Sequence, residues 1–451
     1  MRPAPLRNSD SAWRSLVHVC RRWRSLVFGS PGHLDLRLVC TTTTPVRNAL
    51  DIWPSLPLTI VYDRDSTEST GGVDNIIAGL ERTDRVREAY LWGAWSSYSE
   101  ILMTAMQQPF PELRRLWVGL NDQSGTELFV PDSVLGGSAP RLEFLALTNV
   151  LFPGLLKLLL STTHLVYLHL INIPHSGYIS PDTMVPALSM LTSLSYLTLI
   201  FDSPRSRPDR ASRLPPPSIR SVLSDLSYLQ FRGVSEYLED LVACIDAPQL
   251  SDLHIIFFND IVFDTPQLAQ FIDRTHLPRE CEKAHLTFWD RGAEANFSRT
   301  SGYGLDMFRV GISCRGSDFQ VSSLEEVCTS CLLPFSKLED LYIHKNPNEE
   351  LDWNDDIENG LWLGLLHPFT TVKNLYLSEE FATRIAPVLQ ELVGDRTTEV
   401  LPALRNMFIE GFEPGPAQEG IRQFVDARLL AGHHVAFSRW DRKKRVEKVD
   451  D

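Results

Sequence analysis

The chain has 451 residues, of which 43% are hydrophobic, and a formal net charge of −14 at pH 7. A single compact core rarely exceeds about 300 residues, so this length predicts several domains or a repeat array. The acidic balance argues against nucleic acid as a partner, because nucleic-acid binders usually carry a concentrated basic face. It favours a ligand of basic character instead.

The sequence indicates an intracellular protein, cytoplasmic or nuclear. The opening residues MRPAPLRNSD lack the apolar run of a secretory signal, and no stretch reaches the roughly 18 apolar residues of a membrane span. The seven cysteines are scattered along the chain, which is typical of free thiols in a reducing compartment. We therefore expect no membrane contact and no disulfide framework.

An amphipathic helix near the N-terminus is the first predicted element. Trp13, Cys20 and Trp23 belong to an apolar stripe with three- and four-residue steps, while the neighbouring arginines lie largely elsewhere. Gly29 and Pro31 end the helix. We expect its apolar face to be buried, so that truncation of Trp23 destabilises this end of the chain.

A short strand pattern, L-x-x-L-x-L with apolar substitutions, recurs along most of the chain at intervals of 22 to 34 residues. Its copies start at Val86, Leu113, Leu142, Leu165, Leu194, Leu226, Leu250, Lys283, Leu305, Leu338, Val372 and Leu404. Weaker matches at Leu34 and Leu58 extend the series toward the N-terminus. A pattern repeated this often predicts a repeat array.

Amphipathic stretches such as SEILMTAMQQ and VSEYLEDLVACI lie between the strand patterns. Each unit is therefore a strand, a turn and a helix, and stacked units share one core. We predict an α/β solenoid over residues 31–432, with parallel concave strands and convex helices. Loops are expected at 202–218 and 345–360, and a charged tail at 433–451. This organisation resembles the leucine-rich-repeat superhelix.

The stretch VCRRWRSLV followed by GSPGHLDLRL resembles the second half of an F-box. The matching residues are Val19, Cys20, Arg21, Trp23 and Leu26. The downstream segment TPVRNALDIWPSLPLTIV is similar to the segment after this motif in many fungal F-box proteins with repeat domains. The resemblance implies a non-catalytic adaptor of a cullin-based (SCF-type) ubiquitin ligase. Its F-box would dock on the linker subunit of the ligase, and its repeats would capture the target protein.

The chain departs from the F-box family before Trp13, where the L-P-x-E segment and the first helix of the motif have no counterpart. The resemblance therefore covers a box truncated at its N-terminal half. Two alternatives stay open. The VCRRW stretch could be a helical cap on the first repeat, and the whole chain could be a protein-binding scaffold unconnected to ubiquitin.

Strand alternation turns the third, fifth and seventh positions of each unit toward the concave surface. Aromatic residues occupy a much larger share of these positions than the 10% found in the whole chain. The expected partner-binding residues are Tyr90, Trp92, Trp117, Phe144, Tyr167, His169, Tyr196, Tyr228, His254, Trp289, Tyr342, His344, Tyr376 and Phe408. We expect Trp117, Tyr167, Tyr196 and Tyr228 to lie side by side as a recognition surface. The alternative is simple packing between strands, which favour aromatic residues wherever they point.

Signals for catalysis and metal binding are weak. Cys328 and Cys331 form a single C-x-x-C on a predicted helix, without a second pair at zinc-finger spacing, and are expected to be buried thiols. His433 and His434 adjoin the charged tail and are expected at a solvated end. Nucleotide-binding and hydrolase motifs do not occur. We therefore expect no enzymatic activity, no metal and no cofactor.

Overall fold

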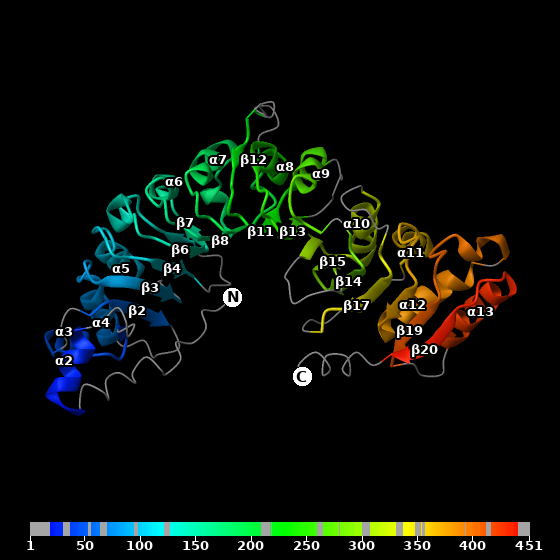
Figure 1. Ribbon diagram of the computed structural model, residues 1–451, viewed down its shortest axis with the longest axis horizontal. Coiled ribbons are helices and arrows are strands. Elements are labelled where there is room, and N and C mark those ends of the chain that lie inside the picture. The colour runs from blue at the N-terminus through cyan, green and yellow to red at the C-terminus, as the bar shows by residue number, and fades with distance from the viewer. Residues whose placement is uncertain are drawn as a thin grey trace. The chain divides into compact units, whose positions relative to one another are not determined.

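A computed structural model gives the structure of the chain (Figure 1). It describes residues 19–29, 37–52, 56–63, 70–93, 98–120, 127–208, 217, 219–258, 265–278, 280–299, 307–330, 337–347, 353, 357–392, 394–411 and 416–440. The chain divides into two compact units. Unit 1 runs to Ser206 and includes Leu223–Leu226, while unit 2 holds Arg207–Val222 and the chain from Ser227 onward.

Unit 1 is a parallel sheet with helices along one face (Figure 1). Its main sheet has the strand order β1-β2-β3-β4-β6-β8-β9, which follows the chain. These strands are β1 (Leu38–Thr41), β2 (Leu58–Asp63), β3 (Val86–Trp92), β4 (Arg115–Gly119), β6 (Phe144–Thr148), β8 (Tyr167–Ile173) and β9 (Tyr196–Phe201). A separate pair is formed by β5 (Leu128–Phe129) and β7 (Val150–Leu151). The helices are α2 (Arg21–Gly29), α3 (Val46–Ile52), α4 (Thr70–Leu80), α5 (Ser99–Ala105), η2 (Val134–Gly137), α6 (Leu155–Leu159), η3 (His175–Gly177) and α7 (Pro181–Ser189).

The strand pattern fills the layer between the sheet and the helices. In β8, Leu168 and Leu170 are buried, whereas Tyr167 and His169 on the opposite face keep part of their surface. Each strand aligns with its neighbour through backbone hydrogen bonds, such as the one from Tyr167 N to Glu143 O at 3.0 Å. The predicted leucine-rich-repeat-like architecture is confirmed by this alternation of parallel strands and helices.

Unit 2 has the strand order β11-β13-β16-β15-β14-β17-β18-β19-β20. These strands are β11 (Tyr228–Gly233), β13 (Asp252–Phe258), β14 (Lys283–Trp289), β15 (Gly292–Ser298), β16 (Met307–Ser313), β17 (Asp340–Lys345), β18 (Asn374–Leu377), β19 (Asn406–Glu410) and β20 (Ala436–Trp440). A small pair is formed by β10 (Ser221–Val222) and β12 (Ile245–Asp246). The helices are α8 (Ser235–Cys244), α9 (Pro266–Asp273), α10 (Ser317–Thr329), α11 (Asn359–Leu366), α12 (Glu379–Gln390), η5 (Gly394–Thr398) and α13 (Pro416–Leu430).

The strand order of unit 2 reverses between β14 and β16, which corrects the expectation that every strand is parallel. β14 and β15 form an antiparallel hairpin around Asp290 and Arg291, and β15 is also antiparallel to β16. β14 therefore pairs with β17, and β16 pairs with β13. The buried Gln320 side chain holds the hairpin, because its Nε2 donates to Trp289 O and Cys314 O at 3.2 Å each.

Buried polar side chains fix other connections in unit 2. The Glu239 carboxylate accepts hydrogen bonds from the backbone N–H groups of Gln267, at 3.0 Å, and Leu268, at 2.8 Å, so α8 caps the N-terminus of α9. The guanidinium of Arg428, which has no exposed surface, donates to carbonyl oxygens of the segment before β19 at 3.1 to 3.2 Å. These side chains form hydrogen bonds with backbone groups that have no partner within the helices and strands.

The described structure differs from the predicted charged tail. β20 pairs in parallel with β19, so the array continues beyond 432 to Trp440, because β19 offers backbone groups that another strand can satisfy. His433 and His434 are exposed, as expected. The insertion at 345–360 is anchored by Trp353, whose ring lies 5.2 Å from that of Phe288. Residues 209–216 of the other insertion lie outside the described residues.

Among the described residues, no helix combines the length and the apolar character that a membrane crossing requires.

Candidate protein-interaction face

We call the sheet face opposite the helices the open face; it corresponds to the predicted concave surface. In unit 1 it presents three rows of side chains that run across the strands. Register aligns Glu88, Arg115 and Phe144 with Tyr167 and Tyr196 in the first row. The second row contains Tyr90, Trp117, Ala146, His169 and Thr198, and the third contains Trp92, Gly119, Thr148 and Ile171.

Aromatic rings form a continuous chain of contacts across the open face of unit 1. We call this chain the first aromatic row. Its successive ring centroids are 5.9, 6.0, 5.8 and 4.5 Å apart. Its members are Trp92, Trp117, Phe144, Tyr167 and Tyr196. Except for the buried Trp117, these residues keep part of their surface exposed, so the row offers aromatic area to a ligand.

Gly119 determines the position of Trp92, the first member of the first aromatic row. A Cβ atom on Gly119 would stand 2.6 Å from Cζ3 of Trp92 and 3.0 Å from Cβ of Thr148. Trp92 therefore lies across the strand backbone at a place where any other residue would displace it. This packing explains why a small residue occupies an outward position between two larger ones.

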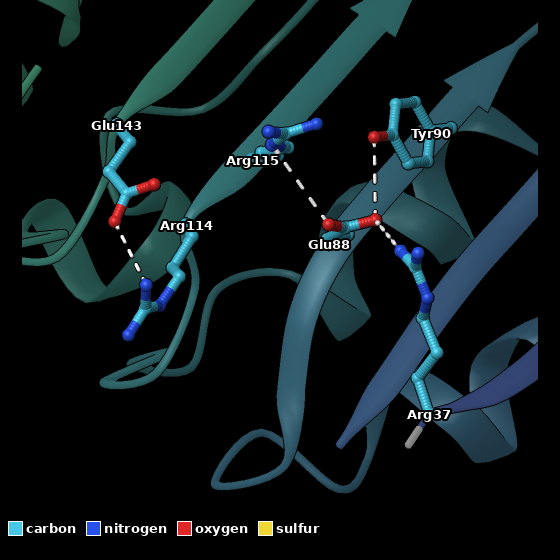
Figure 2. A network of polar contacts seen from close by, with 6 residues as sticks. All are labelled: Arg37, Glu88, Tyr90, Arg114, Arg115 and Glu143. Atoms are coloured by element: carbon cyan, nitrogen blue, oxygen red, sulfur yellow. Dashed lines mark hydrogen bonds and ion pairs between the residues drawn. The ribbon is translucent and has the colours of Figure 1, made fainter. Parts of the chain in front are cut away.

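A polar network is formed around Glu88 (Figure 2), and its member Arg115 pairs in register with Phe144 of the first aromatic row. Glu88 Oε2 accepts hydrogen bonds from Arg37 Nη1, at 3.2 Å, and from the Tyr90 hydroxyl, at 3.4 Å. Burial, and next the Glu88 carboxylate, raise the pKa of Tyr90, so its hydroxyl stays protonated and can donate. Arg115 Nε is 3.9 Å from the second Glu88 oxygen, and its side chain is 55% exposed. Arg115 also interacts with Tyr90.

His169 packs against the same rings. Its ring lies 5.5 Å from that of Phe144 and 6.3 Å from that of Tyr167, and its Nδ1 is 2.9 Å from Thr198 Oγ1. Burial lowers the pKa of His169 from its usual 6.5 to about 4. The imidazole is therefore neutral at physiological pH and acts as a hydrogen-bonded aromatic group.

Unit 2 carries a second aromatic row, formed by His285, Tyr342, Tyr376 and Phe408. These rings stack almost parallel, with successive centroids 4.3, 4.2 and 4.5 Å apart. Trp440 of β20 packs against Tyr342 and Tyr376 at 5.9 and 5.4 Å. Both tyrosines are only 5% exposed, so the middle of this row is closed to a ligand, whereas His285 and Phe408 at its ends keep part of their surface exposed.

Other predicted face residues of unit 2 enter polar contacts. His254 Nε2 is 2.9 Å from Glu294 Oε2, and the Tyr228 hydroxyl donates to Gln230 Oε1 at 3.2 Å. The buried His344 places its Nε2 3.4 Å from Nδ1 of His285.

The second aromatic row is bordered by an amide ladder. Asn406 Nδ2 donates to Asn374 Oδ1, and Asn374 Nδ2 donates to Asp340 Oδ1, each at 2.7 Å. Trp289 lies at the end of β14, beside the hairpin turn, and keeps part of its surface exposed.

The expected alignment of Trp117 with Tyr167 and Tyr196 is wrong. Trp117 occupies the second row, whereas Phe144 continues the row of the two tyrosines. Residues at the same position of successive repeats share a row. Trp117 is the fifth residue of its repeat, whereas Phe144, Tyr167 and Tyr196 are the third residues of theirs. Tyr228 belongs to unit 2.

The N-terminal motif residues are exposed. Val19, Trp23 and Leu26 are 64%, 47% and 60% exposed, and Cys20 and Arg21 are exposed as well. This corrects the expectation that Trp23 is buried. Trp13, the first member of the apolar stripe, lies outside the described residues.

No group of three or more metal-ligating side chains occurs among the described residues. Cys328 of α10 is buried, and burial raises its pKa far above the ordinary thiol value. This agrees with the expected structural thiol, whereas Cys331 lies outside the described residues.

Sequence reasoning missed several members of the open face. Glu88 and Arg115 occupy third positions of their repeats, so the alternation that located the aromatic residues could also have located them. Glu294 lies on β15, whose sequence GAEANFS alternates in size but lacks the leucines of the repeat. Trp440 comes directly after the short alternating segment VAFSR, which the neighbouring charges assign to the tail.

No known protein family matches the chain, and no curated protein matches it. Among solved structures, the chain is similar to the leucine-rich repeat-containing protein LegL7 from Legionella pneumophila. The identity is 14% and the TM-score is 0.28, and the match covers 75% of this chain and 90% of that chain. A likeness at this level adds nothing to the repeat geometry described above.

Proposed function

We propose that the chain is a non-catalytic protein-binding scaffold that captures its partner on the open face of unit 1. The first aromatic row carries this proposal. It joins partly exposed rings from successive strands, and aromatic side chains give large contact area with few rotors to freeze on binding. The rigid parallel sheet fixes the rings before a partner arrives, which lowers the entropic cost of binding.

The test is partner capture by the double variant Tyr167→Ala/Tyr196→Ala. Binding of captured partners should weaken at least about tenfold, equivalent to about 1.4 kcal/mol, because two adjacent contact rings are lost. The control is Leu160→Ala/Met190→Ala, which truncates two apolar residues, 53% and 49% exposed, away from the open face. This control variant should capture its partners as strongly as the unsubstituted chain does. Equal capture by both variants would place the binding surface elsewhere.

A finer function rests on the N-terminal motif, and we propose it second. The exposed residues Val19, Trp23 and Leu26 stand four and three positions apart, which lines them up on one side of a helical segment. Exposed apolar stripes of this kind are typical of docking helices. They support an adaptor that binds the linker subunit of a cullin-based ubiquitin ligase, as the F-box resemblance implies.

The linker subunit, purified, should bind the full-length chain, and Trp23→Ala should abolish that binding. The same substitution should change the free energy of unfolding by less than about 0.5 kcal/mol, because Trp23 is exposed. Leu160→Ala, at the C-terminal cap of α6, is the matched control. No binding by the unsubstituted chain would leave a scaffold unconnected to ubiquitin, with the proposal for the open face intact.

A further inference from the structure

In the first of the three rows set by register, an arginine precedes three aromatic rings. Register places Arg115, Phe144, Tyr167 and Tyr196 on one line across β4, β6, β8 and β9. Neighbouring strands are about 4.8 Å apart, so the three rings stand about 5, 10 and 14 Å from Arg115 along this line. Because the cation lies at one end of the line and the rings follow it, this surface would favour one orientation of a bound chain.

The charge at the head of this line is positive. At the third, fifth and seventh repeat positions of β3, β4, β6, β8 and β9, the charged side chains are Glu88 and Arg115. Glu88 is 16% exposed, and Arg37 and Tyr90 already donate to its carboxylate. Arg115 is 55% exposed and 3.9 Å from the nearest Glu88 oxygen. It also interacts with Tyr90 and with Glu143, but the Glu143 carboxylate already pairs with Arg114 at 3.1 Å, so Arg115 presents the surplus positive charge to a ligand.

We propose that this line binds an extended peptide segment with one acidic side chain and two apolar side chains at alternate positions. The proposal rests on the proposed binding function of the open face. Side chains on one side of an extended peptide are about 6.8 Å apart. A carboxylate on Arg115 therefore places the next side chain between Phe144 and Tyr167, and the following one over Tyr196.

The chemistry of each position supports this ligand. A guanidinium matches a carboxylate with paired, charge-assisted hydrogen bonds, while the rings contact apolar side chains. The net charge of −14 favours a basic ligand only when it is averaged over the whole chain. A ligand group a few ångströms from Arg115 is governed by the positive charge of Arg115, because charges farther away than about 8 to 10 Å are largely screened.

The experiment measures fluorescence anisotropy of labelled synthetic peptides that carry Glu-x-Trp-x-Leu in a Gly/Ser background. Matched peptides replace Glu by Gln or by Lys. The Glu peptide should bind at least about tenfold more tightly than the Gln peptide, and the Lys peptide should bind most weakly. A peptide of reversed sequence tests the direction of the bound chain.

Arg115→Gln should make the Glu and Gln peptides bind equally, with an unchanged unfolding midpoint. The matched control is Arg141→Gln, since Arg141 is 56% exposed, is paired with a carboxylate and lies just before β6. This control should keep the preference for the Glu peptide.

Equal binding of the Glu and Gln peptides by the unsubstituted chain would overturn the acidic specificity. If that binding still falls in Tyr167→Ala/Tyr196→Ala, the proposed function of the open face survives. Failure of all the peptides to bind would also overturn this inference, and partner capture by the same double variant then decides the proposed function separately.

Discussion

The two units carry the same strand pattern but use its outward aromatic residues differently. In unit 1, Phe144, Tyr167 and Tyr196 contact one another and remain partly exposed. In unit 2, Tyr342 and Tyr376 stack at 4.2 Å, and Trp440 packs against both rings, so that each tyrosine is 5% exposed. The same position in a repeat thus contributes to a surface in one unit and to a packed cluster in the other.

This difference bears on the two interpretations of the aromatic enrichment, recognition and packing between strands. Neighbouring rings touch in both units, so packing accounts for part of the enrichment everywhere. The distinction comes from a covering residue, Trp440, which belongs to a later strand than the rings it covers. Stability measurements on matched tyrosines therefore separate the two roles.

The largest expected effect is the loss of a covered ring. Tyr376→Ala should lower the free energy of unfolding by about 3 to 5 kcal/mol, as truncation of a buried aromatic residue does. Tyr167→Ala should cost much less, because its ring is partly exposed in the folded chain. Urea denaturation of both variants measures the difference, and equal losses would show that the two rows are packed alike.

Acid should weaken unit 1 through His169. Its folded-state pKa of about 4 lies below the unfolded value of 6.5, so the unfolded chain binds the proton first as the pH falls. The contribution of His169 is complete above pH 6.5 and is lost as the pH falls to about 4, by about 3 kcal/mol at most.

The measurement compares the unsubstituted chain with His169→Gln, which cannot gain this proton. The unsubstituted chain should lose more unfolding free energy between neutral pH and about pH 4.5 than the variant does. Identical losses would mean that His169 accepts a proton in the folded chain as readily as in the unfolded one.

The smallest effect is expected when the second aromatic row is uncovered. Trp440→Ala removes two ring contacts and should cost about 1 to 2 kcal/mol. Iodination mapped by mass spectrometry should then modify Tyr342 and Tyr376 faster, so that unit 2 comes to resemble unit 1. Arg439→Ala, an exposed neighbour on the same strand, should leave both tyrosines protected. Unchanged protection in Trp440→Ala would mean that other residues cover this row.

The repeat architecture could be predicted because the leucine pattern is local and recurs. Leu168, Leu197 and Leu229 are fully buried, as their positions in the motif indicate. The hairpin of β14 and β15 could not be predicted in the same way. Its second strand has no leucine, and the pairing of β14 with β17 depends on which strand edge is free after the chain has turned back.

The site could be predicted in part for the same reason. Alternation assigns Tyr167 and His169 to the open face, because it depends only on neighbouring residues in one strand. The contact between Trp117 and Phe144 joins the fifth position of one repeat to the third position of the next, which alternation within one strand does not predict. The burial of Tyr376 depends on Trp440 from a distant part of the sequence. Exposure of Trp23 likewise depends on what the rest of the chain places beside it.

The reversed strand order in unit 2 also has a kinetic consequence. Repeat arrays fold by adding each unit to the one before it, through contacts that are short in sequence. Asp252 instead pairs with Met307, and Lys283 with Asp340, at about twice the separation that joins Tyr228 to Asp252. Ordering that spreads from β11 must therefore wait at β13 until the chain through β16 is available. This reversal divides the folding of unit 2 into an early and a late stretch.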